Sequence, residues 1–387
     1  MLPAIEIITL LLLLPYTVLL FYYRHSWLQM KEFFPPENPV YTTFISVIVP
    51  ARNEEKNIRA CIHSIMQQTY PSDLFELIIV DDHSTDATAD IVLSFPQKNI
   101  YLLQLSDVLP NDIINSYKKK AIESAIKISK GSVIVTTDAD CIVKPQWLEQ
   151  IAALYESSGP VFMAAPVCYF DFEKNDSSLK KFFKIFQSLD FLSLQGITGA
   201  SVSRQFHNMC NGANLGYEKK AFEAVNGFEG IDNIASGDDM LLLYKIAKKF
   251  PGKISYLKSG SAIVYTKSAE SLSAFFHQRI RWASKASLYP DAKITTVLFF
   301  VYFANVWLLA LSVLSFFSIK YFYLLLAAMV LKIAGELIFL FPVAGFFDKK
   351  KLLWWFIPSQ PFHILYTVIA GLLGKFGHYT WKGRKVK

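Results

Sequence analysis

Two aspartates lie one residue apart, directly after an apolar run in the middle of the chain. Asp138 and Asp140 follow Val133–Val135, which has the character of a buried strand. Two carboxylates at the end of such a strand repel each other unless a cation lies between them. Mg²⁺ and Mn²⁺ favour this oxygen-only ligation and bridge readily to phosphates. A solvated loop with incidental acids is the alternative, because short motifs often match by chance.

The elements that would position these carboxylates are strands that alternate with helices between residues 44 and 285. The strands are short and nearly continuously apolar, which predicts an α/β fold with a mainly parallel sheet covered on both faces. The predicted strands cover residues 45–50, 77–81, 101–105 and 133–137, and the predicted helices cover 54–68, 85–93 and 118–129.

Polar clusters follow three of the predicted strands, at Ala51–Glu54, Asp81–Asp86 and Asp138–Asp140. In open parallel sheets, ligands bind beyond the carboxyl ends of the strands. We therefore expect the three clusters to converge on one site, although scores of residues separate them in the chain. This convergence favours a metal site over a loop with incidental acids.

Three more polar segments lie downstream. Cys210–Tyr217 is either suited to close approach of the backbone to a ligand or an ordinary strand with a turn. Asp238 and Asp239 open an amphipathic helix at residues 240–247. Acids there are often caps and dipole partners, but an adjacent pair also lets one acid orient while the other acts as a general base. Gln278–Trp282 is either an interfacial membrane anchor or a segment that holds a diphosphate and stacks a sugar ring or base.

Apolar runs at both ends of the chain predict membrane segments. Hydrophobic residues make up 52% of the chain, against roughly 45–50% in globular proteins. Residues 4–23 match the length of about 20 residues that spans a bilayer. A cleavable signal peptide is disfavoured, because bulky Tyr22–His25 stands where a small-residue cleavage site is expected. We expect a retained anchor at residues 1–24, a soluble domain at 44–285 and further apolar runs at 294–317, 321–347 and 352–373.

Basic residues flank these runs and predict their orientation. Arg24 and Lys349–Lys351 place the domain on the cytoplasmic side, so we expect an integral protein of a bacterial inner membrane. The C-terminal region, residues 292–375, is expected to hold two or three spans. Its last run contains Pro358 and Pro361 and either spans or re-enters; re-entry keeps the basic tail at residues 376–387 inside.

Charge and cysteine content exclude several classes of protein. The formal charge of +7 is explained by membrane topology and contact with anionic lipid, and no nucleic-acid-binding signature accompanies it. The four cysteines contain no C-x-x-C pair, which indicates reduced thiols in a cytoplasmic domain.

Lys332 and Glu336 lie four residues apart in an apolar run, where they either pair on one helix face or have a functional role.

Five segments, in order, resemble the family 2 inverting glycosyltransferases. The last of them is similar to the Q-x-x-R-W motif of membrane-embedded members, which include cellulose, hyaluronan and chitin synthases and ceramide glucosyltransferase. The resemblance covers roughly residues 46–282. The five segments are Val49–Glu55, Asp81–Asp86, Asp138–Asp140, Gly237–Asp239 and Gln278–Trp282.

The resemblance implies a GT-A fold, a nucleotide-sugar donor with UDP as the default nucleotide, and Mg²⁺ or Mn²⁺ as cofactor. It implies Asp239 as the catalytic base and Asp138 and Asp140 at the metal. Tyr117 departs from the family pattern by replacing a glycine, and Asp238 by replacing a glutamate. The donor would be bound by Pro50, Arg52, Glu54, Asp81, Asp82, Lys118 and Asp138, and the diphosphate and acceptor by Asp238, Gln278, Arg281 and Trp282.

The resemblance implies a hexosyltransferase that inverts the configuration of the anomeric carbon in one displacement. Residues 177–194 are apolar with interspersed lysines, so they either lie in the membrane interface and admit a lipid acceptor or form a helix that covers the sheet. We favour transfer of a single sugar to a lipid or lipid-linked acceptor. A processive polysaccharide synthase and an inactive scaffold or export partner that keeps the fold are the alternatives.

Overall fold

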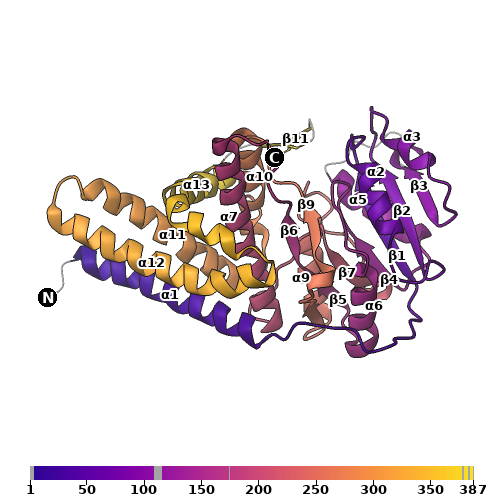
Figure 1. Cartoon of the computed structure of the whole chain (residues 1–387), viewed down its shortest axis with the longest axis horizontal. Coiled ribbons are helices and arrows are strands. Elements are labelled where there is room, and N and C mark those ends of the chain that lie inside the picture. The colour runs from indigo at the N-terminus through magenta and orange to yellow at the C-terminus, as the bar shows by residue number, and fades with distance from the viewer. Residues whose placement is uncertain (1–3, 109–115, 174, 377–378, 382–383, 387) are drawn as a thin grey trace.

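A computed structural model of the chain divides into an α/β domain and a bundle of long helices (Figure 1). A single helix, α7 (Ser178–Ser203), lies between the two parts. The structure describes residues 4–108, 116–173, 175–376, 379–381 and 384–386. Residues 1–3 of the predicted anchor, and residues 377–378, 382–383 and 387 of the predicted basic tail, lie outside this range.

The α/β domain is built on a seven-stranded sheet of order β3-β2-β1-β4-β7-β5-β8. β1 pairs in parallel with both β2 and β4, whereas β7 runs antiparallel to its neighbours β4 and β5. The predicted mainly parallel α/β sheet is therefore confirmed. The strands are β1 (Ile45–Ala51), β2 (Phe75–Asp81), β3 (Ile100–Gln104), β4 (Val133–Thr136), β5 (Phe162–Ala164), β7 (Leu215–Glu218) and β8 (Ile254–Tyr256), with β6 (Val167–Tyr169) and β9 (Val264–Thr266) in a separate parallel pair.

Helices cover both faces of this sheet, which explains why its strands are apolar throughout. Ile48 and Ile78 pack into the core beneath α5 and α9. Their neighbours Val47 and Leu77 point to the opposite face, into the core beneath α2 and α6. The helices of the domain are α2 (Ile58–Met66), α3 (Thr88–Leu93), α4 (Leu105–Val108), α5 (Tyr117–Ile128), α6 (Trp147–Ser158), α8 (Lys219–Ala224), α9 (Asp238–Lys249) and α10 (Leu272–Ala283).

Four helical segments within the described residues are long and apolar enough to cross a membrane. Their positions agree with the apolar runs predicted at both ends of the chain. The last segment is a 3₁₀ turn (Lys350–Trp355) that continues into α13, and whether it spans or re-enters stays a prediction. The helices are α1 (Ala4–Gln29), α11 (Ala292–Leu314), α12 (Ile319–Phe346) and α13 (Phe356–Phe376).

Helix α7 packs against the sheet domain on one side and the bundle on the other. It contacts β6 and β8 as well as α1 and α12. Two glycines allow the close approach to the bundle: a Cβ on Gly196 would lie 2.6 Å from Val343 of α12, and one on Gly199 would lie 2.7 Å from Trp27 of α1. The interpretation in which this segment covers the sheet is thus supported, and its other side is part of the bundle.

Two further contacts hold the domain to the bundle. Lys258 Nζ donates to the carbonyl oxygens of Trp27 at 2.9 Å and Met30 at 2.7 Å. A positive charge is favourable there, because the C-terminus of a helix such as α1 carries partial negative charge. Asp171 forms an ion pair with Lys349, just beyond α12. These contacts, together with the packing of α7, join the sheet domain to one end of the bundle.

Candidate active site

The three polar clusters predicted to converge meet at the wall of one cavity of about 1240 Å³. They do so because β2, β1 and β4 are adjacent in the sheet and end at the same edge. Asp81 is the exception: it is buried at the end of β2 and is not part of the lining. Asp140, predicted at the metal, also lines the cavity. The lining residues that the sequence predicted for the donor are Pro50, Arg52, Glu54, Asp82, Lys118 and Asp138.

Hydrogen bonds tie the loops after β1 and β2 to each other. Arg52 Nη1 donates to the carbonyl oxygen of Asp82 at 2.9 Å, and the same nitrogen lies 3.7 Å from the Asp82 carboxylate. The backbone N–H of Asn53 donates to Ser84 Oγ at 3.0 Å. Asn53 and His83 both have positive φ angles, 52° and 54°. The two loops thus form one rigid wall of the cavity.

Lys118 connects the two groups of acids that the sequence placed a hundred residues apart. Its Nζ lies 2.8 Å from Asp138 Oδ1 and 3.1 Å from Asp238 Oδ2. Burial alone would lower the pKa of Lys118, but the carboxylates of Asp138 and Asp238 outweigh it and raise the pKa. Lys118 therefore stays protonated and draws the D-x-D and the acidic pair together.

Asp138 and Asp140 fit a hard divalent ion. Their carboxylate oxygens and the Cys141 sulfur lie within 4.8 Å of one another. Burial, with a contribution from both aspartates, raises the pKa of the Cys141 thiol well above its usual value. Hard divalent ions prefer oxygen to sulfur ligands, so the Cys141 sulfur is not a preferred ligand for them. The remaining oxygen donors suit Mg²⁺ or Mn²⁺ better than a softer ion.

Asp239 lies in the first turn of α9, with both carboxylate oxygens held by backbone N–H groups. Oδ2 accepts from Gly212 at 3.0 Å and Oδ1 from Met240 at 2.7 Å. A Cβ on Gly212 would lie 3.3 Å from Lys118 Nζ, so this loop lies close to Lys118, and its approach to a ligand stays a prediction. Burial, followed by the charge of Asp238, raises the pKa of Asp239. Asp239 is thus oriented and a stronger base than an ordinary aspartate.

A buried lysine that sequence reasoning missed supports the loop before the acidic pair. Lys119 Nζ donates to the carbonyl oxygens of Ile231 at 2.6 Å and Ile234 at 2.7 Å, and to that of Ser236 at 3.2 Å. Burial lowers the pKa of Lys119 to about 8. The adjacent lysine Lys118 was predicted from the family motif, whereas the role of Lys119 depends on a loop more than a hundred residues away.

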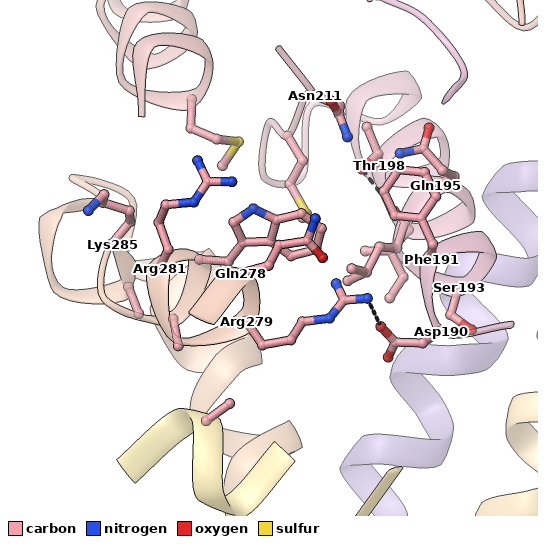
Figure 2. A pocket seen from close by; sticks show the side chains of 18 of the residues that line it. Asp190, Phe191, Ser193, Gln195, Thr198, Asn211, Gln278, Arg279, Arg281 and Lys285 are labelled. Atoms are coloured by element: carbon pink, nitrogen blue, oxygen red, sulfur yellow. Dashed lines mark hydrogen bonds and ion pairs between the residues drawn. The ribbon is translucent and has the colours of Figure 1, made fainter. Parts of the chain in front are cut away.

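Helix α10 brings Gln278, Arg281 and Trp282 to the cavity wall, as predicted. Figure 2 also shows Arg279 of the same helix reaching toward Asp190 of α7; Arg279 Nη2 lies 2.7 Å from Asp190 Oδ2. Sequence reasoning missed this pair. Asp190 is the only acid in the apolar sequence of α7, and that isolated charge was the available signal.

Comparisons with known proteins agree with this fold. The family model "Glycosyl transferase family 2" matches residues 46–225. The chain is 31% identical over 116 residues to glycosyltransferase AglE of Haloferax volcanii, which covers 30% of this chain and 36% of AglE. It is 32% identical over 122 residues to a dolichyl-phosphate β-glucosyltransferase of Dictyostelium discoideum, which covers 29% of this chain and 35% of that protein. The chain thus aligns with about a third of the length of these relatives.

A solved structure extends the comparison to the fold of nearly the whole chain. The mannosyltransferase PcManGT from Pyrobaculum calidifontis superposes with a TM-score of 0.56 at 18% identity, over 96% of this chain and 98% of that one. The likeness shows that the α/β domain has the GT-A fold of glycosyltransferases. Together with the family match, it supports a family 2 glycosyltransferase with long apolar helices at both ends.

Proposed function

We propose that the chain is an inverting glycosyltransferase that moves a sugar from a nucleotide-sugar donor to a lipid or lipid-linked acceptor. One observation carries the proposal: a single cavity contains Asp138, Asp140 and Asp239 and continues between helices long and apolar enough to span a membrane. The flanking basic residues support a catalytic domain on the cytoplasmic face of a bacterial inner membrane.

The donor would lie against the wall formed by the loops after β1 and β2. Pro50, Arg52 and Glu54 line the nucleoside side with Asp82, while one oxygen of the buried Asp81 has no hydrogen bond to a described residue. We infer that Asp81 or Asp82 contacts the base and that UDP is the nucleotide. PcManGT was solved with GDP-Man and Mn²⁺, which supports a divalent ion on this fold.

The chain's own residues account for the transfer step. Asp239 takes the proton of an acceptor hydroxyl as that oxygen attacks the anomeric carbon from the face opposite the diphosphate, so the configuration inverts. Lys118 and Arg281 place positive charge beside the diphosphate as it leaves. A bound Mg²⁺ or Mn²⁺ on Asp138 and Asp140 would neutralise part of that charge as a Lewis acid. No covalent glycosyl-enzyme is required, unlike in retaining hydrolases.

The function is tested with the full chain in lipid nanodiscs. A panel of UDP- and GDP-sugars is supplied with Mn²⁺, nucleoside diphosphate release is measured, and the lipid fraction is analysed by mass spectrometry. A product with one added hexose is expected; a ladder of long polymers would establish a processive synthase instead, and release of no nucleoside diphosphate would favour an inactive scaffold.

Substitution of Asp239 separates catalysis from donor binding. Loss of a general base lowers rates by roughly 10²–10⁴-fold, so Asp239→Asn should lose transfer in that range while donor affinity by calorimetry is kept. Only the ionised Asp239 carboxylate accepts a proton, and burial raises its pKa. Wild-type activity should therefore rise with pH, with an apparent pKa above that of an ordinary aspartate. The exposed Asp73→Asn is the matched control. An equal loss of donor affinity in Asp239→Asn contradicts the assignment as base.

A further inference from the structure

The cavity wall around α7, α10 and α13 contains buried polar atoms that make no hydrogen bond of ordinary geometry within the described residues, although Tyr169 interacts with Gln278 and Arg279, and Thr367 interacts with Tyr366. The residues that carry these atoms all line the cavity. Most buried polar groups in native proteins are paired, so a group of unpaired ones requires an explanation. The atoms are Tyr169 Oη, Gln278 Oε1, Arg279 Nε and Nη1, His363 Nδ1 and Thr367 Oγ1.

These five residues and Asp190 form what we call the junction cluster. Its centre is rigid: the side chains of Arg279 and Asp190 are only 4% and 5% exposed and lie 2.7 Å apart. Asp190 also accepts a hydrogen bond from the Tyr366 hydroxyl of α13. The Arg279 guanidinium lies 4.4 Å from the ring centroid of Trp282. The unpaired atoms are therefore held at fixed positions.

The ion pair of Arg279 and Asp190 gives the junction cluster no net charge. Arg279 and Asp190 cancel, and the other members contribute hydroxyl, amide and imidazole groups. A phosphate accepts hydrogen bonds only, so it would lie against the Gln278 carbonyl and the Asp190 carboxylate unfavourably. A hydroxyl both donates and accepts, which matches this mixture of donors and acceptors.

Two other cations of the cavity lie apart from the junction cluster. Figure 2 shows Arg281 and Lys285 on the opposite side of the view from Asp190, with Gln278 between them. Both line the cavity, where the proposed function assigns the donor diphosphate. Arg281 and Lys285 therefore add no positive charge next to the Arg279–Asp190 pair.

The proposed base, Asp239, also favours a hydroxyl over a phosphate as the acceptor group. A hydroxyl nucleophile must lose its proton during attack, whereas a phosphate monoester is already largely ionised at neutral pH. Lys118 pairs with Asp138 and Asp238, and Asp239 adds a third carboxylate beside Asp238, so an attacking anion would approach a site that already contains three acids. A base beside an acidic cluster suits a neutral hydroxyl nucleophile.

We propose that the junction cluster binds the uncharged, hydroxyl-bearing headgroup of a membrane lipid, which is the acceptor. This inference rests on the proposed function and names the acceptor class of the same site. In the reaction the acceptor O–H bond breaks and its proton passes to Asp239. The new bond joins that oxygen to the anomeric carbon, and the bond to the nucleoside diphosphate breaks with its electron pair. Leu298 and Phe299 of α11 and Phe339 of α12 give the same cavity an apolar wall for the lipid chain.

The acceptor class is tested with the full chain in dioleoylphosphatidylcholine nanodiscs, loaded with the sugar donor and Mn²⁺. The added acceptor is dioleoylglycerol, monoglucosyl dioleoylglycerol or undecaprenyl phosphate. We expect transfer to a hydroxyl lipid at about tenfold or more over the background cleavage of donor by water, a preference of about 1.4 kcal/mol. Transfer to undecaprenyl phosphate alone, or donor cleavage without transfer to either hydroxyl lipid, overturns the inference and leaves donor cleavage standing. Absence of all donor cleavage overturns the proposed function itself.

Two nearly isosteric variants test the junction cluster directly. Tyr169→Phe and Thr367→Val each remove one hydroxyl of the junction cluster, and each should raise the KM for the hydroxyl lipid by about tenfold. The KM for the donor and the rate of donor cleavage by water should not change. Thr296→Val, at an exposed position of α11 outside the cavity lining, is the matched control. An unchanged acceptor KM in both variants, or an equal loss of donor cleavage, contradicts the assignment.

Discussion

Two buried clusters of polar side chains lie along α13, and they differ in whether their atoms are paired. One of them, which we call the bundle cluster, consists of Tyr16, Lys332, Glu336 and Gln360. In it, Lys332 Nζ donates to Glu336 Oε1 at 2.7 Å and to Gln360 Oε1 at 2.6 Å. Gln360 Nε2 donates to the second Glu336 oxygen at 3.0 Å, and the Tyr16 hydroxyl donates to the first. Every one of these side chains has a partner, whereas the junction cluster leaves several atoms unpaired.

The difference separates a structural role from a binding role. A polar network away from water is stabilising when all its members are paired and costly when they are not. The bundle cluster joins α1, α12 and α13 and completes its own hydrogen bonds, so it needs no ligand. The junction cluster retains the cost of its unpaired atoms beside the catalytic acids, where a bound headgroup would remove it.

The largest effect is expected when the bundle cluster is broken at its acid. Glu336→Ala leaves the Lys332 ammonium, whose side chain is fully buried, without its counter-charge. Breaking a buried ion pair in this way costs about 3–5 kcal/mol. The midpoint of thermal unfolding, followed by intrinsic fluorescence of the purified chain in nanodiscs, should fall accordingly.

A double substitution controls for the loss of packing. Lys332→Met combined with Glu336→Leu removes both charges and keeps much of the volume, so most of the lost stability should return. If Glu336→Ala unfolds at the wild-type temperature, the pair is not part of the structure of the bundle, and the comparison between the two clusters fails.

A smaller effect on stability is expected from Tyr→Phe substitutions, and it should differ between the two clusters. The Tyr16 hydroxyl donates to a carboxylate, and such hydrogen bonds contribute about 1.5–3 kcal/mol, so Tyr16→Phe should lower stability by that amount. The Tyr169 hydroxyl makes no hydrogen bond of ordinary geometry within the described residues and interacts with Gln278 and Arg279, so Tyr169→Phe should lower stability by less than Tyr16→Phe does. Both are measured by thermal unfolding without acceptor lipid.

The two tyrosines also give opposite results in function. Tyr169→Phe should weaken acceptor binding while stability is largely kept, and Tyr16→Phe should reduce stability while the acceptor KM of the folded fraction is kept. Equal destabilisation by both variants would show that the Tyr169 hydroxyl is paired in the free protein, and the junction cluster would then be structural.

The sheet and its strand-end acids were predictable because they depend on local patterns. Apolar runs of strand length fixed β1, β2 and β4, and parallel strands end at one edge. Asp138 and Asp140 therefore met the loop after β1 as predicted. The departure at Asp81 follows from a single position in the chain: Asp81 is the last residue of β2, while Asp82, which is also buried, begins the loop that lines the cavity.

The clusters were predictable only in part, because their members come from distant elements. The four-residue spacing of Lys332 and Glu336 indicated a pair on one helix face. Their partner Tyr16 lies 320 residues away from Glu336, and no pattern in the sequence connects α1 with α12. Arg279 and Asp190 likewise lie in different helices, α10 and α7, with no sequence pattern that connects them. Their ion pair is therefore seen only in the packing of these helices.

The smallest effect is expected at an ion pair that is exposed and not buried. Asp171 pairs with Lys349 between the domain and the bundle, and the Asp171 side chain is 75% exposed. Exposed pairs contribute less than about 1 kcal/mol and are screened by salt. Asp171→Asn should therefore shift the unfolding midpoint slightly, and raised ionic strength should shrink the shift toward zero. The opposite outcome is a fall in the unfolding midpoint as large as that of Glu336→Ala and unchanged by salt. It would mean that the contribution of an ion pair to stability depends on its place between the domain and the bundle and not on its burial.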